Sequence, residues 1–518
     1  MKILFTPFIL LFLLLASCSS NDSDEIQTEN PISLPTISTV EVTTIGQTSV
    51  TVSGSASYDG GANIADKGIV WGLNSNPDLN SNKKSSGSGT GNFVAQITNL
   101  EPNTTYYFRS YATNSKGTSY GQQLTATTLN SEPQEIVYEG DVVLGTQQEV
   151  EDFGAIGYTK ITGRLFCGGN QITSSKITSL QALSSIKEVG SLWINYMDDL
   201  ENLNGLENIT DINGVFYIKS NRALNDLSGL RNVVNIDGLL SIYRNDKLTS
   251  INRFDALKTV GDIQVFDNET LKIVDTFNEV SETRGFLFQQ NEGVDYIGGF
   301  SKLKKLEYLT IKSNSGSFSV DSFHEVEEMQ GYLFVNRNRE MTSFKGFEKL
   351  VTSPEAIQFV ENRNLTSISG FHVIKELKWL LMFVNGINSL NAFDSLEIAD
   401  EIDFSTNFGT YNLGGFENLH KVNSLAIDNN ENMSQLNGFN NLEEVGLLKI
   451  DLNAKLTKIN GLTSLRKCTS IQIASNPVLT DFCGLQALFV NDIDLEPSIE
   501  NNAYNPTKQE IAEGDCFQ

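Results

Sequence analysis

The chain has 518 residues, of which 39% are hydrophobic, so it is long enough for several domains with buried cores. Its 37 Lys and Arg residues against 63 Asp and Glu residues give a formal net charge of -26. Such a surface repels phosphate backbones and anionic lipid headgroups, so we expect no nucleic-acid partner. The charge is also typical of the soluble coat of a secreted protein.

Residues 1–17 have the features of an export signal. Lys2 precedes an apolar run that ends at Leu15, too short for a spanning helix, and small residues follow it. The tetrapeptide Leu-Ala-Ser-Cys that ends at Cys18 resembles the lipobox of bacterial lipoproteins, which implies cleavage before Cys18 and its acylation. A plain secretory signal with an incidental cysteine is the alternative. No later apolar run approaches membrane-spanning length, so we expect lipid to be the only membrane anchor.

Residues 18–35 are polar and acidic and contain Pro31 and Pro35, which predicts a disordered acidic tether. An acidic stretch after a lipidated cysteine also resembles the surface-export signal of Bacteroidota-like lipoproteins. That resemblance implies an outer-membrane protein that faces outward. The alternative is that the acidic stretch is only a spacer, which implies no particular location.

Residues 36–128 alternate in the manner of short strands separated by turns. Their later part resembles the fibronectin type III sandwich, in which Leu-x-Pro-x-Thr-x-Tyr precedes an alternating strand ending in Ala-x-Asn. The resemblance implies a spacer domain and a corner tyrosine at Tyr106. The matching residues are Leu100, Pro102, Thr104, Tyr106, Phe108, Ala112, Asn114 and Gly117.

A linker at residues 129–139 precedes a repeat region at residues 140–518, which we expect to carry a cap at each end. Thr146 followed by Glu149 fits a capping box, and Val150 and Phe153 would face inward. A short helix here would cover the first open edge of the repeat region.

One pattern recurs at intervals of 22 to 24 residues, which predicts a solenoid of about 13 turns. The position two residues before each anchor is also apolar, and this period of two indicates parallel strands stacked at about 4.8 Å. The anchors are Ile194, Ile218, Ile242, Val265, Phe288, Ile311, Val335, Phe359, Met382, Phe404, Ile427, Ile450 and Ile473.

An Asn recurs three residues after the anchor, where it could satisfy backbone groups of adjacent coils that would otherwise each cost roughly 1 to 3 kcal/mol. We interpret this series as a structural ladder and not as a catalytic one. A Gly eleven residues after the anchor is expected to supply a positive-φ corner. The ladder comprises Asn221, Asn245, Asn268, Asn291, Asn314, Asn338, Asn362, Asn385, Asn407, Asn430, Asn453 and Asn476.

With this pattern, residues 140–518 resemble the receptor L-domain and its leucine-rich-repeat relatives. The resemblance implies a right-handed parallel β-solenoid used for recognition, with no catalytic residue. The chain is therefore expected to be mainly β, a sandwich followed by a solenoid. Three strand faces, or one face with short helical turns, both remain possible.

Four cysteines follow Cys18. Cys468 falls in an apolar column of the repeat and is expected to be buried. Cys483 in the last repeat and Cys516 in the tail are the favoured disulfide, although four free thiols are the alternative. No CxxC spacing occurs, which disfavours a zinc site.

Few residues suggest catalysis. The three histidines, His324, His372 and His420, are expected in solvated loops, and no nucleophile-elbow, zinc-protease, P-loop or EF-hand motif is present. Acid pairs such as Glu327-Glu328 are explained by charged loops. We therefore expect no enzyme activity, no metal and no cofactor. A carbohydrate-active β-helix enzyme is the rival hypothesis.

Aromatic residues next to the anchors are expected to face outward and to form a candidate binding face. The favoured function is therefore lipid-anchored recognition or adhesion at the cell surface, with a protein or glycan ligand. A structural role in envelope or matrix assembly is a further alternative, and the face could instead pack against the sandwich or lie under loops. The candidate residues are Trp193, Tyr217, Tyr243, Phe266, Phe334 and Phe383.

Overall fold

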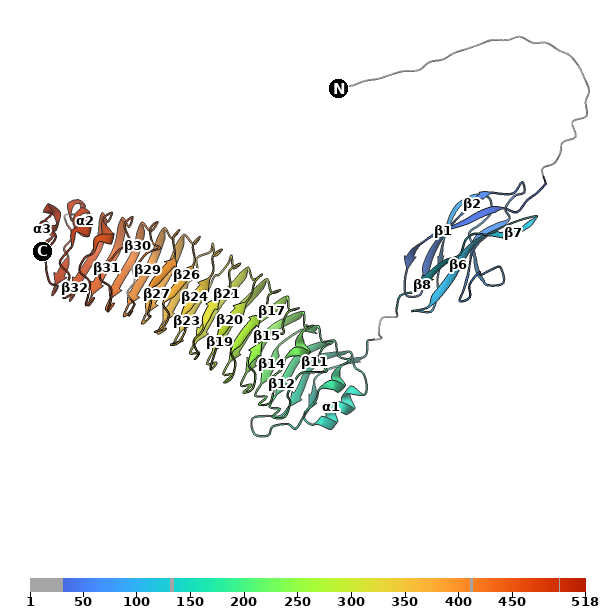
Figure 1. Cartoon of the computed structure of the whole chain (residues 1–518), viewed down its shortest axis with the longest axis horizontal. Coiled ribbons are helices and arrows are strands. Elements are labelled where there is room, and N and C mark those ends of the chain that lie inside the picture. Colours follow the sequence, from blue (N-terminus) through green and yellow to red (C-terminus); the bar gives the residue numbers. More distant parts are fainter. Residues whose placement is uncertain (1–30, 131–134, 410–412, 493) are drawn as a thin grey trace, which may run out of the picture. The chain divides into compact units, whose positions relative to one another are not determined.

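The computed structural model describes residues 31–130, 135–409, 413–492 and 494–518. The chain divides into two compact units, Met1–Gln134 and Glu135–Gln518, which are described separately below. Figure 1 shows the second unit as a long stack of coils, from green to red. The predicted export signal, the lipidation site at Cys18 and the tether up to residue 30 lie outside the described residues. In the described ranges no helix is long and apolar enough to cross a membrane.

The first unit is a sandwich of two antiparallel sheets with a fibronectin type III-like strand arrangement. Val52, Ile69 and Phe108 are fully buried between the sheets. One sheet contains β1 (Thr36–Ile45), β2 (Val50–Tyr58) and β5 (Gly91–Ile97). The other contains β4 (Asn82–Ser85), β3 (Asp66–Gly72), β6 (Thr105–Asn114) and β7 (Gly117–Tyr120), and β8 (Leu124–Thr127) also pairs with β6.

Tyr106 lies at the corner that the sequence predicts. Its ring is buried, and its hydroxyl accepts a hydrogen bond from the backbone N–H of Glu101 at 3.0 Å. The tyrosine therefore ties the start of β6 to the loop before it.

The sandwich extends beyond residues 36–128 at both ends, so the predicted tether and linker are too long. The Ser33 N–H donates to the Gly60 carbonyl at 2.8 Å, and the Leu129 N–H donates to the Gly46 carbonyl at 3.0 Å. At the other end of the linker, β9 (Val137–Tyr138) already pairs with a solenoid strand. These ends are held by backbone hydrogen bonds to neighbouring loops, which leave no periodic side-chain pattern in the sequence.

The second unit is a parallel β-solenoid. Its main sheet has 18 strands in the described residues, hereafter the long sheet. Two of these strands, β9 and β13, share a coil with another strand, which leaves about 16 coils. Besides β9, the strands of the long sheet are β10 (Val142–Leu144), β11 (Lys160–Gly168), β12 (Glu188–Asn195), β13 (Asp211–Ile212), β14 (Phe216–Lys219), β15 (Asn235–Tyr243), β17 (Thr259–Phe266), β19 (Glu282–Gln289), β21 (Lys305–Lys312), β23 (Tyr332–Asn336), β25 (Ala356–Val360), β27 (Glu376–Phe383), β29 (Ile398–Ser405), β30 (Lys421–Asp428), β31 (Glu444–Asp451), β32 (Lys467–Ala474) and β33 (Ser498–Glu500).

A second, seven-stranded sheet closes the middle coils only, again counting the described residues. The first and last coils have 3-10 turns in its place: η1 (Gln181–Leu183), η2 (Ser228–Leu230), η3 (Asn460–Leu462) and η4 (Cys483–Leu485). In the described residues the middle coils thus have two strand faces and not three, whereas the 3-10 turns of the first and last coils fit the alternative of one strand face with short helical turns. The seven strands are β16 (Ser250–Ile251), β18 (Ile273–Thr276), β20 (Tyr296–Gly299), β22 (Ser319–Asp321), β24 (Ser343–Gly346), β26 (Ser367–Gly370) and β28 (Ser389–Ala392).

The count of about 13 turns was low because the terminal coils depart from the repeat. Strands β10 and β11 precede the first anchor, Ile194, and β33 follows the last anchor, Ile473. The last coil does keep the pattern, since Asn502 lies three residues after Ile499 and accepts the N–H of Asn476 through its Oδ1 at 3.0 Å. Its spacing from Asn476 is 26 residues, outside the 22 to 24 range of the others.

The twelve ladder asparagines are all buried and linked in one series. Asn338 is representative: its Nδ2 donates to the Ile311 carbonyl at 2.8 Å, and its Oδ1 accepts both the N–H and the Nδ2 of Asn314 at 3.0 and 2.9 Å. Each carboxamide thus satisfies backbone groups of the preceding coil that the turn leaves without strand partners.

Each ladder Asn follows a residue in the left-handed conformation, with φ between 51° and 59° and never glycine. Val384 and Thr406 are β-branched residues at this position, where the left-handed region costs roughly 1–2 kcal/mol. The buried hydrogen bonds of the following Asn hold this unfavourable turn in place.

A second ladder fills the core with stacked rings. Neighbouring centroids lie 5.0 to 5.7 Å apart, a normal spacing for aromatic pairs. The ladder crosses the middle coils and continues beyond the second sheet. Its members are Phe254, Phe277, Phe300, Phe323, Phe347, Phe371, Phe393, Phe416 and Phe439.

The prediction of a positive-φ corner at every repeat glycine is only partly correct. Gly299 and Gly370 have φ of 90° and 123°, but Gly229, Gly346, Gly461 and Gly484 do not have positive φ. These four are required for close packing instead. A Cβ on Gly484, for example, would lie 2.0 Å from the Ile459 carbonyl oxygen of the preceding coil.

Helices cap both ends of the stack (Figure 1). At the first end, α1 (Gln147–Gly154) has the predicted capping box between Thr146 and Glu149, and Val150 and Phe153 are buried. At the last end, α2 (Gln486–Asn491) packs against α3 (Lys508–Glu513). The tail then pairs antiparallel at Asp481 and Phe517, so it does not offer another parallel strand edge.

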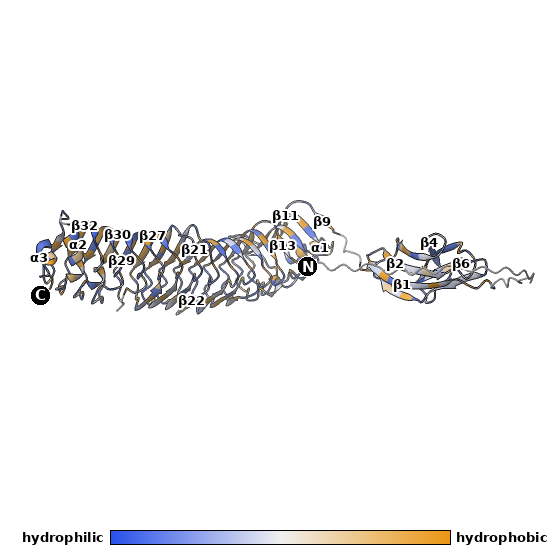
Figure 2. Cartoon of the chain, turned by 90° about the horizontal axis from the view of Figure 1, so that it is seen from above, coloured by the Kyte–Doolittle hydropathy of each residue, from blue (hydrophilic) through white to orange (hydrophobic). Residues whose placement is uncertain are grey.

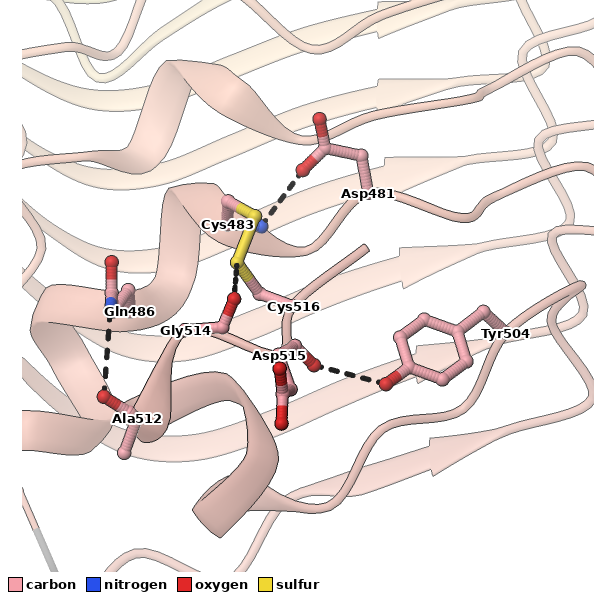
Figure 3. Close-up of a disulfide and its surroundings, with 8 residues drawn as sticks. All are labelled: Asp481, Cys483, Gln486, Tyr504, Ala512, Gly514, Asp515 and Cys516. Atoms are coloured by element: carbon pink, nitrogen blue, oxygen red, sulfur yellow. Dashed lines mark hydrogen bonds between the residues drawn. A yellow bond between two sulfur atoms is a disulfide. The ribbon is translucent and has the colours of Figure 1, made fainter. Parts of the chain in front are cut away.

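A disulfide joins Cys483 to Cys516 across the last cap (Figure 3), the pair favoured from the sequence. Cys167 and Cys468 are free and buried. Cys468 is in register with Val445, as the repeat predicts. Burial raises the pKa of Cys468 to about 11 and that of Cys167 to about 12, so both thiols are kept protonated and unreactive.

We predict that Asn338→Ala lowers the free energy of unfolding by about 2–4 kcal/mol, because three buried groups of adjacent coils lose their partner. Urea denaturation measures the change. The control is Asn364→Ala, which removes an exposed Asn bonded to Glu340 and should cost under about 0.5 kcal/mol. Equal effects of the two variants would contradict a structural role for the ladder.

We also predict that the double variant Cys483→Ser/Cys516→Ser loosens the last cap by about 2–4 kcal/mol, because the bond closes a loop with a sequence separation of 33. Hydrogen exchange of residues 494–518 should become faster while that of the middle coils stays unchanged. Added reductant should reproduce this in the unmodified protein and have no further effect in the variant. Uniform loosening of the whole solenoid would contradict it.

Candidate functional site

The outer face of the long sheet carries the six predicted aromatic residues. Side chains alternate along each strand, so anchors point inward and their neighbours point outward. In Figure 2 the solenoid coils accordingly carry hydrophobic and hydrophilic positions next to one another. All six aromatic side chains are half-buried. The rings are on the outward side but only partly exposed, because neighbouring coils only one strand spacing apart cover part of each ring.

Trp193 and Tyr217 form one cluster near the first end. Their rings meet edge to face at 5.1 Å, and Phe166 of the preceding coil lies 6.1 Å from Trp193. The Arg164 guanidinium lies over the Trp193 ring at 4.7 Å. The Trp193 Nε1 is buried without a hydrogen-bond partner among the described residues. Trp193 therefore contributes to the packing of this surface as well as to the aromatic area that the surface exposes.

Tyr243 and Phe266 form a second cluster on the next coils. Their rings stack at 4.4 Å with an interplanar angle of 12°. The Lys219 ammonium lies 5.0 Å from the Tyr243 ring centroid, which adds a cation–π contact. A flat aromatic surface with a cation beside it results.

Phe334 belongs to a third, more open cluster, whose other aromatic members are not among the six predicted residues. With Tyr332 and Trp379 it lines a hollow of about 660 Å³ over the middle of the long sheet. Tyr332 and Trp379 are 46% and 36% exposed. Both lie three residues before an anchor, and a strand period of two places that position outward as well. The period-two pattern therefore also predicts Tyr332 and Trp379 on the outer face. Phe383, the sixth residue, lies on the same strand as Trp379.

Acidic residues replace aromatic ones on the later coils. Desolvation raises the pKa of Asp403 and of Asp451. Lys449 contacts Asp428 and lies 3.8 Å from Asp451. In the described part of the chain no three His, Cys, Asp or Glu residues are arranged to hold a metal ion.

The histidines do not form a common site. His324 lies 2.8 Å from Glu348 of the next coil, and His372 lies 2.7 Å from Asp394. Glu327 and Glu328 form ion pairs with Lys304 and Lys305 of the preceding coil, at 3.0 and 3.2 Å respectively. Such partly exposed ion pairs between coils each contribute little to stability.

A second hollow, of about 680 Å³, lies at the Asn corner of the first coils. Its charged side chains are largely paired with one another, since Arg244 bonds Asp267 at 2.6 Å and Arg222 lies 3.8 Å from Asp198. A ligand would have to separate these pairs. The aromatic hollow is therefore the better candidate site.

Comparisons with known proteins give no family and weak structural matches. No protein-family model matches the chain, and no curated protein matches it. Two solved structures of the sensor domain of the anti-sigma factor RsgI4 from Pseudobacteroides cellulosolvens are 23% identical to it; each match covers 19% of this chain and 99% or 78% of the other, with a TM-score of 0.16. The sixth fibronectin type III domain of human fibronectin type III domain containing protein 3 is 21% identical, with 20% of this chain and 88% of that one covered and a TM-score of 0.15. These values carry no argument about function.

We predict that Asp403→Asn raises the melting temperature at pH 7. Burial raises the pKa of Asp403 in the folded state, so the charged form destabilises the fold as pH rises above the unfolded value of about 3.9. The gain should therefore shrink as the pH falls towards about 4. Asp237→Asn, at an exposed position, removes the same charge and should leave the melting temperature nearly unchanged. A pH-independent effect of Asp403→Asn would contradict this assignment.

Proposed function

We propose that this protein is a lipid-anchored cell-surface recognition protein, whose solenoid binds a protein or glycan without catalysis. The observation that carries the proposal is the series of aromatic clusters along the outer face of the long sheet. Large rigid rings provide contact area at a small entropic cost, and they are typical of binding surfaces.

The rigidity of the platform supports this function. The Asn ladder and the stacked core rings hold successive coils in register, so the outer rings are positioned before a ligand arrives. Preorganisation of this kind reduces the entropy lost on binding. It is also favourable for an adhesion surface spread over many coils.

The lipobox-like sequence at Cys18 and the acidic residues that follow support the proposed location. A lipid on Cys18 would attach the protein to the outer membrane, and residues of the tether would separate the folded units from it. The sandwich would then act as a spacer between the tether and the solenoid.

The proposal predicts that Trp193→Ala, Tyr217→Ala and Tyr243→Ala each weaken ligand capture by about tenfold or more without unfolding the solenoid. The measurement is binding of the purified protein to arrays of glycans and cell-surface proteins, with released sugars monitored in the same wells. Ile273→Ala changes a 41% exposed residue of the second sheet and should leave binding unchanged.

Each other outcome favours a different function. Release of sugars would favour a carbohydrate-active enzyme. Self-association without any other ligand would favour a structural role in the envelope or matrix. If all three aromatic variants bind the ligand as strongly as the unmodified protein does, the part of the outer face around Trp193, Tyr217 and Tyr243 is excluded as the binding site.

A further inference from the structure

We propose that the hollow between Tyr332 and Trp379 binds a neutral polysaccharide chain that runs along the solenoid axis. This inference rests on the proposed recognition function and names its ligand class and its site. It follows from the packing of one column of outer residues, from the lining of the hollow, and from its direction across the strands.

The hollow exists because one column of the long sheet is interrupted. Tyr308 lies over Gly285, where a Cβ would come within 2.0 Å of its ring, and its hydroxyl donates to Asp262 two coils earlier at 2.7 Å. The Tyr332 ring stacks on the Tyr308 ring of the preceding coil, with the ring centroids 5.9 Å apart. The next residue of the column is Ala356, which is in register with Tyr332. The column of rings therefore stops there.

Trp379 resumes the column on the next coil. The strands of Tyr332 and Trp379 are two strand spacings apart, about 10 Å, with only the methyl group of Ala356 between them. Van der Waals contact needs about 3.5–4 Å on each side of an inserted group. A slot of the size of one flat ring thus lies between two exposed aromatic side chains.

The lining of the slot is suited to sugar hydroxyl groups. Gln289, Thr310 and Gln358 are neutral side chains on β19, β21 and β25, able to donate and to accept hydrogen bonds. The aromatic faces suit the C–H faces of a pyranose ring. This combination of rigid rings and neutral polar groups is what a carbohydrate requires.

The charges favour a neutral ligand over an anionic one. Lys312 and Glu355 are the two charged residues that line the hollow among the described residues, and their charges cancel. The whole chain carries a formal charge of -26 and would repel a polyanion.

The direction of the hollow favours a glycan over a peptide. Its lining residues come from β19, β21, β23, β25 and β27, so it crosses about four strand spacings, about 19 Å. An extended peptide rises about 3.3 Å per residue, out of step with a strand spacing of about 4.8 Å. The length of one sugar in an extended chain is close to that spacing. Successive coils can therefore contact successive sugars.

The test is affinity electrophoresis and calorimetry of the full chain with two neutral polysaccharides, xyloglucan and galactomannan, and with anionic polygalacturonate. Tyr332→Ala and Trp379→Ala should each weaken binding of a neutral polysaccharide by about tenfold or more. Ala356→Trp should also abolish binding, because it fills the slot and completes the column. Circular dichroism checks the fold of each variant, and Trp379→Ala stands as the test if Ala356→Trp does not fold.

Leu447→Ala is the matched control. Leu447 is 42% exposed and also lies three residues before an anchor, but on β31, outside the hollow. Its substitution should leave the affinity unchanged. No binding of either neutral polysaccharide, equal effects of Leu447→Ala and Trp379→Ala, or preference for polygalacturonate would overturn the inference.

Failure of this site is distinguishable from failure of the proposed function. A ligand found on the arrays that is lost with Tyr217→Ala and retained with Trp379→Ala would leave recognition in place and exclude the hollow. A protein ligand lost with Trp379→Ala would assign the hollow to a different class of partner and overturn the glycan inference. Release of sugars by the unmodified protein would overturn both.

Discussion

The buried carboxamide of the ladder Asn is the interaction on which the rest of the solenoid depends. Each coil with a ladder Asn turns sharply after its long-sheet strand, and the turn uses a left-handed residue that is not glycine. The turn also leaves backbone groups without strand partners. In these coils one Asn satisfies such groups in the coil before it, so the turn is stable only when coils are stacked.

This dependence explains why function is placed on the outside of the sheet. The inward positions are fixed by core packing and the corners by the Asn ladder, which leaves the outward positions free to vary. They change from aromatic clusters on the early and middle coils to acidic residues on the later coils. A linear scaffold can thus carry several different surfaces in series without any change in its core.

The proposed glycan site arises from the absence of an aromatic ring at one position of the column and not from an added residue. A small residue, Ala356, occupies a position where rings precede and follow it, and the fixed strand spacing turns that omission into a slot. A less rigid scaffold would close over such a gap, because exposed rings gain contact by collapsing onto each other. Here the register of the strands keeps Tyr332 and Trp379 apart.

The sequence by itself determined the repeat, the parallel strands, the Asn series, the helix that caps the first coils and the sandwich with its corner tyrosine, because each depends on contacts between residues at fixed spacings. Only the tertiary structure decided how far each unit extends, since Ser33 and Tyr138 are held by backbone hydrogen bonds that leave no side-chain pattern. It also decided which aromatic residues are presented. Trp193 is partly covered by Arg164 of the preceding coil, whereas Tyr332 is 46% exposed, because ring exposure depends on side chains of neighbouring coils that are distant in the sequence.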